Sequence, residues 1–278
     1  MSNLFSPNPA KAAVERWWLL YTPVWGILAG GVMLSGLADH WTDLPLMAFA
    51  LLLAVGAIVP PILRRNHERD LPWHRTTAWR FGLSVILISF FGNYSWCPYF
   101  YDVLHMHYGF QTQWNIRNNP TQMYVMTVPY FATYAVLLTM SWRLAMRALA
   151  GLPRLLQLAA ASLTAFAVAF LETLLNANPW LASLFCYDDM KLMLTFGTFF
   201  YGMLFVVVQP VWVWLDEDPD RPQKQRDVWL WCGAAMYASV LVADLIQYEI
   251  APHFTTVEAG AWQHNLRDWD DGCLIRPD

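Results

Sequence analysis

The chain has 278 residues, of which 57% are hydrophobic and only 14% are charged. Soluble domains usually carry about 25% charged residues, so the composition argues against an ordinary soluble enzyme and favours a membrane protein. The formal net charge of −4 is small, and no basic stripe points to nucleic acid as a partner.

Seven apolar segments are long enough to cross a bilayer, because a spanning helix needs about 20 residues. They lie near 17–38, 44–63, 79–101, 121–142, 155–176, 192–215 and 228–250. The sequence therefore predicts an all-α, polytopic membrane helix bundle of about seven transmembrane helices. We expect residues 1–278 to form a single integral-membrane domain.

The basic residues predict the orientation of the bundle. With seven spans, the N-terminus and the connections 64–80, 143–154 and 216–227 share one side and hold thirteen Lys and Arg residues, whereas the other side holds four. Cytoplasmic segments carry the excess of Lys and Arg. We therefore expect a cytoplasmic N-terminus and a C-terminus outside or in a lumen. A bacterial inner membrane is the expected location, with the endoplasmic reticulum as the alternative.

The stretch 92–110 follows an apolar run and contains more polar and aromatic side chains than a membrane span needs. It holds Asn93, four tyrosines, Trp96, Asp102 and the pair His105 and His107. Polar groups at membrane depth are costly and usually face a protein interior or a cavity. We interpret this stretch as one wall of a substrate pocket.

Polar residues of five spans converge on one layer of the outer half, when depth is estimated from a helix rise of about 1.5 Å per residue. That layer contains Asn93, Tyr94, Tyr124, Thr127, Tyr130, Glu172, Tyr201 and Asp244. The residues also have structural interpretations: Glu172 as an interfacial acid, Asp244 as a structural partner, and the aromatic residues of 94–101 as a belt at the membrane interface.

Signatures of other catalytic or metal sites are absent from the sequence. There is no G-x-S-x-G, P-loop, dinucleotide fingerprint or H-E-x-x-H, and the four cysteines form no C-x-x-C pair. The other five histidines form no cluster comparable to His105-x-His107. An enzyme with this sequence is expected to use acid–base chemistry, with no cofactor and no metal.

A set of residues along nearly the whole chain has a specific order and spacing. These residues are Tyr21-Thr22-Pro23, Trp25, Leu71-Pro72-Trp73, Gly92-Asn93-Tyr94-x-Trp96-x-x-Tyr99-Phe100, Val103-Leu104, Tyr108, Phe110, Asn118, Pro120, Leu171-Glu172-Thr173, Asp189, Met193, Gly197, Phe200-Tyr201, Asp216-Glu217, Asp244-Leu245 and Pro252. Together they resemble the cycloeucalenol cycloisomerase family, the cyclopropyl sterol isomerases of plants and some bacteria.

The chain departs from the plant pattern at several histidines. The pattern has a histidine after the threonine matching Thr127 and after the tyrosine matching Tyr134, where this chain has Val128 and Ala135. Position 98 is proline in place of histidine, and His105 and His107 stand where the family has small residues. If a family histidine carries a proton, this chain must use another group.

The resemblance implies a reaction that opens the 9β,19-cyclopropane ring of a sterol. A proton is added at C19, positive charge develops at C9, and the C8 proton is lost to give an 8,9 double bond, as in the conversion of cycloeucalenol to obtusifoliol. No cofactor is needed. A carboxylic acid held away from water favours its protonated form, and Glu172 and Asp244 are the candidate acids.

The resemblance and this chemistry together give expected roles. We expect Glu172 to be the acid and base, with Asp244 or Asp189 assisting. Aromatic faces stabilise a desolvated cation by about 2 kcal/mol or more, and Asn93 is expected to orient the acid or bind the sterol 3-hydroxyl. The expected substrate-binding residues are Asn93, Tyr94, Trp96, Tyr99, Tyr201 and Asn118.

Two alternatives stay open from the sequence. One is a membrane protein that binds or transports a sterol or another lipid without catalysis. The other is an isomerase of a related non-sterol polycyclic lipid. In each case the expected partners are a polycyclic lipid and membrane lipid, with no nucleic acid and no metal.

Overall fold

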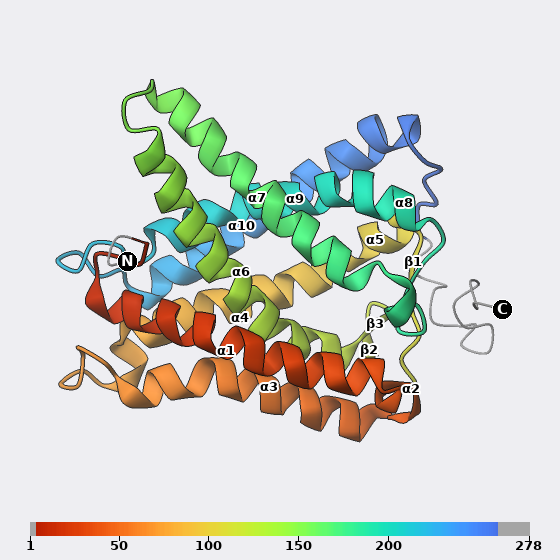
Figure 1. Cartoon of the computed structure of the whole chain (residues 1–278), viewed down its shortest axis with the longest axis horizontal. Coiled ribbons are helices and arrows are strands. Elements are labelled where there is room, and N and C mark those ends of the chain that lie inside the picture. The colour runs from red at the N-terminus through yellow and green to blue at the C-terminus, as the bar shows by residue number, and fades with distance from the viewer. Residues whose placement is uncertain (1–3, 261–278) are drawn as a thin grey trace.

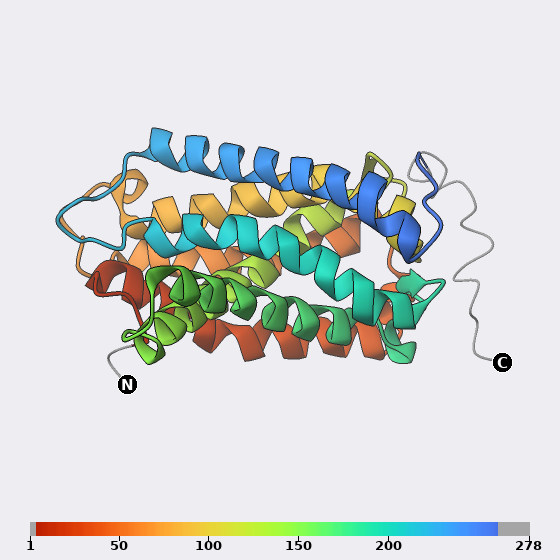
Figure 2. The same cartoon turned by 90° about the horizontal axis from the view of Figure 1, so that it is seen from above.

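The structure is a computed structural model and describes residues 4–260. Long helices run between the two ends of the molecule and lie side by side along its length (Figures 1 and 2). They are α1 (Pro9–Leu34), α3 (Asp43–Arg64), α4 (Thr77–Ser95), α6 (Thr121–Ala148), α7 (Arg154–Asn176), α9 (Thr198–Trp214) and α10 (Gln225–Leu245).

Shorter elements join or extend the long helices. The short α-helices are α2 (Leu37–His40), α5 (Cys97–Leu104) and α8 (Met190–Leu192). Two π-helical turns extend long helices: Met193–Gly197 directly precedes α9, and Ile246–Ile250 directly follows α10. Single 3₁₀ turns lie at Trp73–Arg75, Pro179–Leu181 and Ala251–His253.

Six helical runs within residues 4–260 are long and apolar enough to cross a membrane. They are Pro9–Leu34, Asp43–Arg64, Thr121–Ala148, Arg154–Asn176, Met190–Trp214 and Gln225–His253. The prediction of a polytopic helical membrane bundle is therefore confirmed, and the chain is a multi-pass integral membrane protein.

The long helix outside this set is α4, which occupies the third predicted span. It packs against α1, α3, α6, α9 and α10, and most of its residues are buried. A helix that faces protein rather than lipid does not need to be apolar all round. This explains why α4 carries Arg80, Ser84 and Asn93 and is not among the six runs that are apolar enough to cross a membrane by composition alone.

Two predicted boundaries differ from the structure for local reasons. The third predicted span, 79–101, breaks at Trp96, and α5 begins at Cys97 with Pro98 in its first turn. Proline lacks the N–H that a continuing helix needs. The first helix starts at Pro9 rather than at 17, because the Asn8 side chain accepts a hydrogen bond from the Ala10 amide at 3.0 Å and caps the helix.

The connections that were expected to share one side, because they hold most of the Lys and Arg residues, lie at one end of the bundle. The N-terminus and the connections after α3, α6 and α9 lie at one end, and the strands lie at the other (Figure 1). We call these the N-terminal end and the strand end. The C-terminus, Arg267 and Arg276 lie outside the described residues.

Two small antiparallel sheets cover the strand end. β1 (Met106–Tyr108) pairs with β4 (Phe185–Tyr187), so that Met106 lies opposite Tyr187 and Tyr108 lies opposite Phe185. β2 (Asn115–Ile116) pairs with β3 (Asn119–Pro120). The β1–β4 sheet joins the chain after α5 to the chain after α7.

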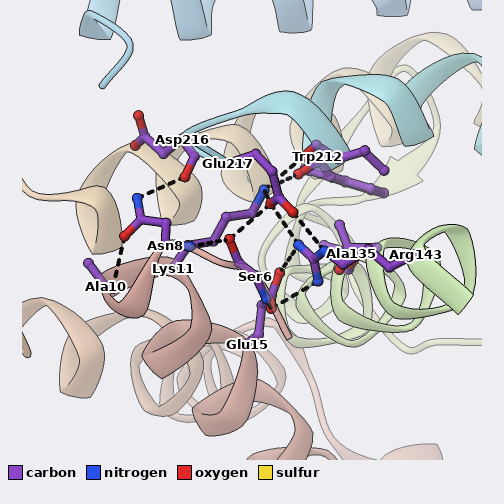
Figure 3. Close-up of polar contacts among 12 residues, drawn as sticks. Ser6, Asn8, Ala10, Lys11, Glu15, Ala135, Arg143, Trp212, Asp216 and Glu217 are labelled. Carbon is purple, nitrogen blue, oxygen red and sulfur yellow. Dashed lines mark hydrogen bonds and ion pairs between the residues drawn. The ribbon is translucent and has the colours of Figure 1, made fainter. Parts of the chain in front are cut away.

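Buried ion pairs close the N-terminal end of the bundle (Figure 3). The Arg143 Nη2 atom lies 2.8 Å from Glu15 Oε1 and 2.8 Å from Glu217 Oε2, and Lys11 Nζ lies 2.9 Å from Glu217 Oε2. The side chains of Lys11 and Glu15 are 0% exposed. We call these four residues the Arg143 network. The sequence predicted Lys11 and Arg143 only as basic residues flanking the spans.

The charges of the Arg143 network balance, with two cations and two carboxylates. Burial by itself raises the pKa of Glu217, but hydrogen bonds from Arg143 and the charge of Lys11 outweigh burial and lower that pKa. Lys11 Nζ also donates to the Trp212 carbonyl at 2.7 Å. The network therefore ties α1 and α6 to the end of α9.

Replacement of Arg143 is expected to destabilise the protein strongly. Arg143→Gln leaves Glu15 buried without its cation, and breaking a buried ion pair in this way costs about 3–5 kcal/mol. The measurement is the unfolding midpoint in detergent micelles. Arg147→Gln, an exposed position one turn further along α6, is the matched control; equal midpoints for the two variants would contradict the role of the network.

The predicted orientation can be measured by cysteine labelling. Asp220→Cys, in the exposed connection at the N-terminal end, is expected to react with a membrane-impermeant maleimide only after the cells are permeabilised. Gln113→Cys, exposed at the strand end, is expected to react in intact cells. The protein without these substitutions corrects for its own cysteines, and the reversed pattern would show the opposite topology.

Candidate functional site

An apolar cavity lies inside the bundle toward the strand end. Its empty volume is about 730 Å³, including its open mouth. Its walls come from α4, α5, α6, α7, α9 and the β1–β4 sheet. Aromatic rings form much of the lining: Trp96, Tyr108, Tyr130, Phe131, Tyr187 and Tyr201.

Four of the predicted site residues line this cavity together. Asn93 comes from α4, Trp96 from the junction between α4 and α5, Glu172 from α7 and Tyr201 from α9. Four segments far apart in the sequence therefore meet around one space.

The Glu172 carboxyl group is held by hydrogen bonds on both oxygens. Asn176, one turn further along α7, donates through Nδ2 to Glu172 Oε1 at 2.6 Å. The Tyr134 hydroxyl, which reaches across from α6, donates to Glu172 Oε2. Among the cavity-lining residues of the described chain, Glu172 carries the only carboxyl group. Its orientation is thus fixed relative to the cavity.

A second polar cluster lies around Asn93. Its Nδ2 atom donates to Thr127 Oγ1 at 2.7 Å and to the Ser89 carbonyl at 2.9 Å. Its Oδ1 atom accepts from Asn119 Nδ2 at 3.0 Å, and Asn119 Nδ2 also lies 3.1 Å from Cys97 Sγ. These contacts hold the amide rigidly, and the adjacent Thr127 hydroxyl lies on the cavity wall.

Aromatic rings surround the site at close range. The ring of Tyr201 lies 4.7 Å from that of Phe205 and 5.5 Å from that of Phe100, measured between centroids. Phe205 in turn lies 5.0 Å from Tyr134. The faces of such rings carry negative potential and attract cations. The cavity thus combines one carboxyl group with an aromatic environment suited to positive charge.

The other predicted acids do not line the cavity. Asp244 Oδ1 accepts a hydrogen bond from the Tyr99 hydroxyl at 2.5 Å, which joins α10 to α5. Asp189 Oδ1 accepts from the Leu192 amide at 2.9 Å and caps α8. Both acids thus have structural partners outside the cavity, which matches the structural interpretation of Asp244. Their catalytic roles stay untested predictions.

Tyr94 and Asn118 also lie outside the cavity lining. Tyr94 is 41% exposed, and the Arg117 guanidinium carbon lies 4.9 Å from its ring centroid. The Asn118 carbonyl accepts from the Tyr101 hydroxyl at 3.3 Å. With Tyr99 bound to Asp244, three of the six predicted substrate-binding residues line the cavity.

The histidines that distinguish this chain from the plant pattern lie beyond the cavity wall. His105 Nε2 lies 3.0 Å from the Thr256 carbonyl oxygen, and His107 Nε2 lies 3.5 Å from Asp188 Oδ1. Neither residue lines the cavity. The structure thus gives neither histidine a contact with the cavity.

Sequence reasoning missed two partners of Glu172 for which a signal existed. Asn176 follows Glu172 by four residues, so both share one face of α7. Thr127, Tyr130 and Tyr134 are spaced by three and four residues and share one face of α6. Tyr187 gave no local signal, because β4 reaches the cavity only through its pairing with β1.

The close approach of Gly109 to β4 yields a prediction about the cavity wall. A Cβ atom at Gly109 would lie 1.7 Å from the Ser183 carbonyl oxygen, so Gly109→Ala is expected to displace the β1–β4 sheet and destabilise the protein by about 1–3 kcal/mol. The thermal midpoint measures this. Gly151→Ala, where a Cβ meets nothing within 4 Å, is the control, and equal midpoints would contradict the prediction.

Comparison with known proteins gives a match over most of the chain. The chain is 31% identical over 255 residues to cycloeucalenol cycloisomerase of Arabidopsis thaliana, and the aligned region covers 89% of each protein. No family model matches the chain, and no solved structure matches it. At this identity and coverage, and in agreement with the residues that carried the resemblance, the chain belongs to the cycloeucalenol cycloisomerase family.

Proposed function

We propose that this protein is a cofactor-independent sterol isomerase that opens the 9β,19-cyclopropane ring of a cyclopropyl sterol, in a reaction of the cycloeucalenol-to-obtusifoliol type. The name of the Arabidopsis thaliana relative supports the substrate class. The observation that carries the proposal is Glu172, the one carboxyl group among the described residues that line the cavity.

The proposed reaction begins with a protonated Glu172. Its proton is transferred to C19 as the C9–C19 bond breaks, and the electron pair of that bond forms the new C19–H bond. A cation results at C9. The C8–H electron pair then forms the C8=C9 double bond, and the C8 proton goes to the Glu172 carboxylate. The product is an isomer of the substrate, and Glu172 ends the cycle protonated.

One carboxyl group is sufficient for both proton transfers. C19 is bonded to C9, and C8 is the neighbour of C9, so both reacting carbons lie one bond from the cationic centre. The hydrogen bonds from Asn176 and Tyr134 keep the carboxyl group in place between the two steps. We therefore assign Glu172 both roles, with Tyr134 and Asn176 as positioning residues.

The rest of the cavity suits the remaining parts of the substrate. Tyr201 and Trp96 present aromatic rings to the cavity, and such rings stabilise a desolvated cation by about 2 kcal/mol or more. Asn93 and Thr127, which line the cavity, offer an amide and a hydroxyl for the sterol 3-hydroxyl, and Asn119 holds Asn93 from behind. In this arrangement the ring system lies between the two polar clusters.

Replacement of Glu172 tests the proposal. Glu172→Gln keeps the shape of the side chain but removes the transferable proton, so turnover is expected to fall by about 10²–10⁴-fold, the usual contribution of a general acid or base. The assay supplies cycloeucalenol to membranes in deuterated water and detects by mass spectrometry an 8,9-unsaturated product with one deuterium in the C19 methyl group.

Controls separate loss of chemistry from loss of structure. Glu249→Gln removes an exposed carboxyl group at the end of α10 and is expected to keep full activity. Full activity of Glu172→Gln would contradict the assigned role of Glu172. A folded wild-type protein that binds the sterol but never converts it would favour the alternative of lipid binding without catalysis.

A further inference from the structure

A second cavity opens at the N-terminal end of the bundle, at the opposite end from the cavity that Glu172 lines. Its empty volume is about 1430 Å³, including its open side. The connections after α3 and α9 form its walls together with the start of α1. We propose that this cavity binds the phosphate group of an anionic phospholipid. The proposal does not depend on the proposed sterol chemistry.

Cationic side chains without partners line this cavity. Among the described residues, neither the Arg75 guanidinium nor the Lys224 ammonium group has a hydrogen-bond or ion-pair partner, and His67 and His74 also lie on the wall. The acid on the wall, Glu68, is already engaged with Thr77. Arg75 and Lys224 outnumber this one carboxylate, so the excess charge on the wall is positive.

The engagement of Glu68 is specific. Its Oε2 atom accepts from the Thr77 amide at 2.8 Å, and its Oε1 atom accepts from the Thr77 hydroxyl at 2.9 Å. Both oxygens thus cap the start of α4 and do not neutralise Arg75 or Lys224.

A buried arginine fixes the two walls relative to each other. Arg80 Nε donates to Asp216 Oδ2 at 2.6 Å, and Arg80 Nη1 donates to the Arg75 carbonyl at 2.5 Å. Asp216 Oδ1 also accepts from the Gln223 amide at 2.8 Å. Arg80 therefore ties the connection that carries Arg75 to the connection that carries Lys224. This clamp sets the relative position of the two backbone segments that carry the unpaired cations.

Helix N-termini also lie on the wall of the cavity. The first residues of α1, α4 and α10, namely Pro9, Thr77 and Gln225, all line the cavity. The N-terminus of a helix carries a partial positive charge that favours anions. Glu68 bonds to the start of α4, the Asn8 side chain caps α1, and Asp227 lies in the first turn of α10, so the helix ends add little beside the charges of Arg75 and Lys224. A phosphate group matches the positive charge of these two side chains.

The rim of the cavity indicates a lipid as the source of the phosphate. Leu71 lines the cavity and is 40% exposed, and Trp73, two residues further, is 51% exposed. Tryptophan concentrates at membrane interfaces, and basic residues beside a membrane attract anionic lipid headgroups. Leu71 beside the cationic wall fits a molecule that has acyl chains and a charged headgroup, whereas free phosphate gains nothing from an apolar contact.

The test is a binding measurement on the delipidated full-length protein in neutral micelles. The probes are dioctanoyl phosphatidylglycerol, dioctanoyl phosphatidylcholine and inorganic phosphate, and binding is followed by native mass spectrometry. Phosphatidylglycerol is expected to bind at least ~10-fold more tightly than phosphatidylcholine, because two unpaired cations meet its net charge. Millimolar inorganic phosphate is expected to leave that binding unchanged.

Charge-matched variants locate the binding. Arg75→Gln with Lys224→Gln is expected to weaken phosphatidylglycerol binding by ~10-fold or more. Arg69→Gln with Arg226→Gln removes the same charge from exposed positions nearby that do not line the cavity, and it is expected to keep the affinity. Unfolding midpoints and each single variant check that the fold is retained.

Three outcomes would overturn the proposal. Equal binding of phosphatidylglycerol and phosphatidylcholine would remove the requirement for an anionic headgroup. Equal weakening in both double variants would show that diffuse surface charge attracts the lipid. Displacement by inorganic phosphate would show that the cavity takes free phosphate rather than a lipid.

Discussion

The Arg143 guanidinium bonds to three other segments of the chain at once. It contacts the Leu4 carbonyl near the N-terminus, Glu15 of α1 and Glu217 after α9. Charges buried away from water are tolerated only when paired and hydrogen-bonded, so these segments must meet in one geometry. Tyr134 lies nine residues from Arg143 on α6, about 13 Å along the helix axis. The contacts that close one end of the bundle therefore also set the position of α6, whose Tyr134 side chain donates a hydrogen bond to the Glu172 carboxyl group.

The sequence predicted the helices well because hydropathy is a local property. The predicted spans 44–63 and 155–176 agree closely with Asp43–Arg64 and Arg154–Asn176. The break at Trp96 was not predicted, because hydropathy shows that a run is apolar but does not show where the helix within it ends. Pro98 was the local signal for the break. The ion pairs of Lys11 were not predicted either, since its partner Glu217 is more than two hundred residues away.

The site was predictable in depth but not in rotation about each helix axis. Asn93, Glu172 and Tyr201 were expected in one layer and line one cavity. Asp244 was expected in the same layer, yet it bonds to Tyr99 and does not line the cavity. Counting residues from a span boundary gives the height of a side chain, whereas its direction depends on the packing of neighbouring helices. Where a helix is apolar on several faces, its own sequence gives little information about that packing.

The use of one carboxyl group, Glu172, for both proton transfers of the proposed isomerisation has a consequence for the energetics of the host membrane. In the proposed isomerisation the proton given to C19 equals the proton recovered from C8, so no net proton is taken from or released to either compartment. Exchange of the Glu172 proton with water between turnovers, on which the deuterium readout relies, moves no net charge. An enzyme of this kind can work within the bilayer without drawing on the proton-motive force.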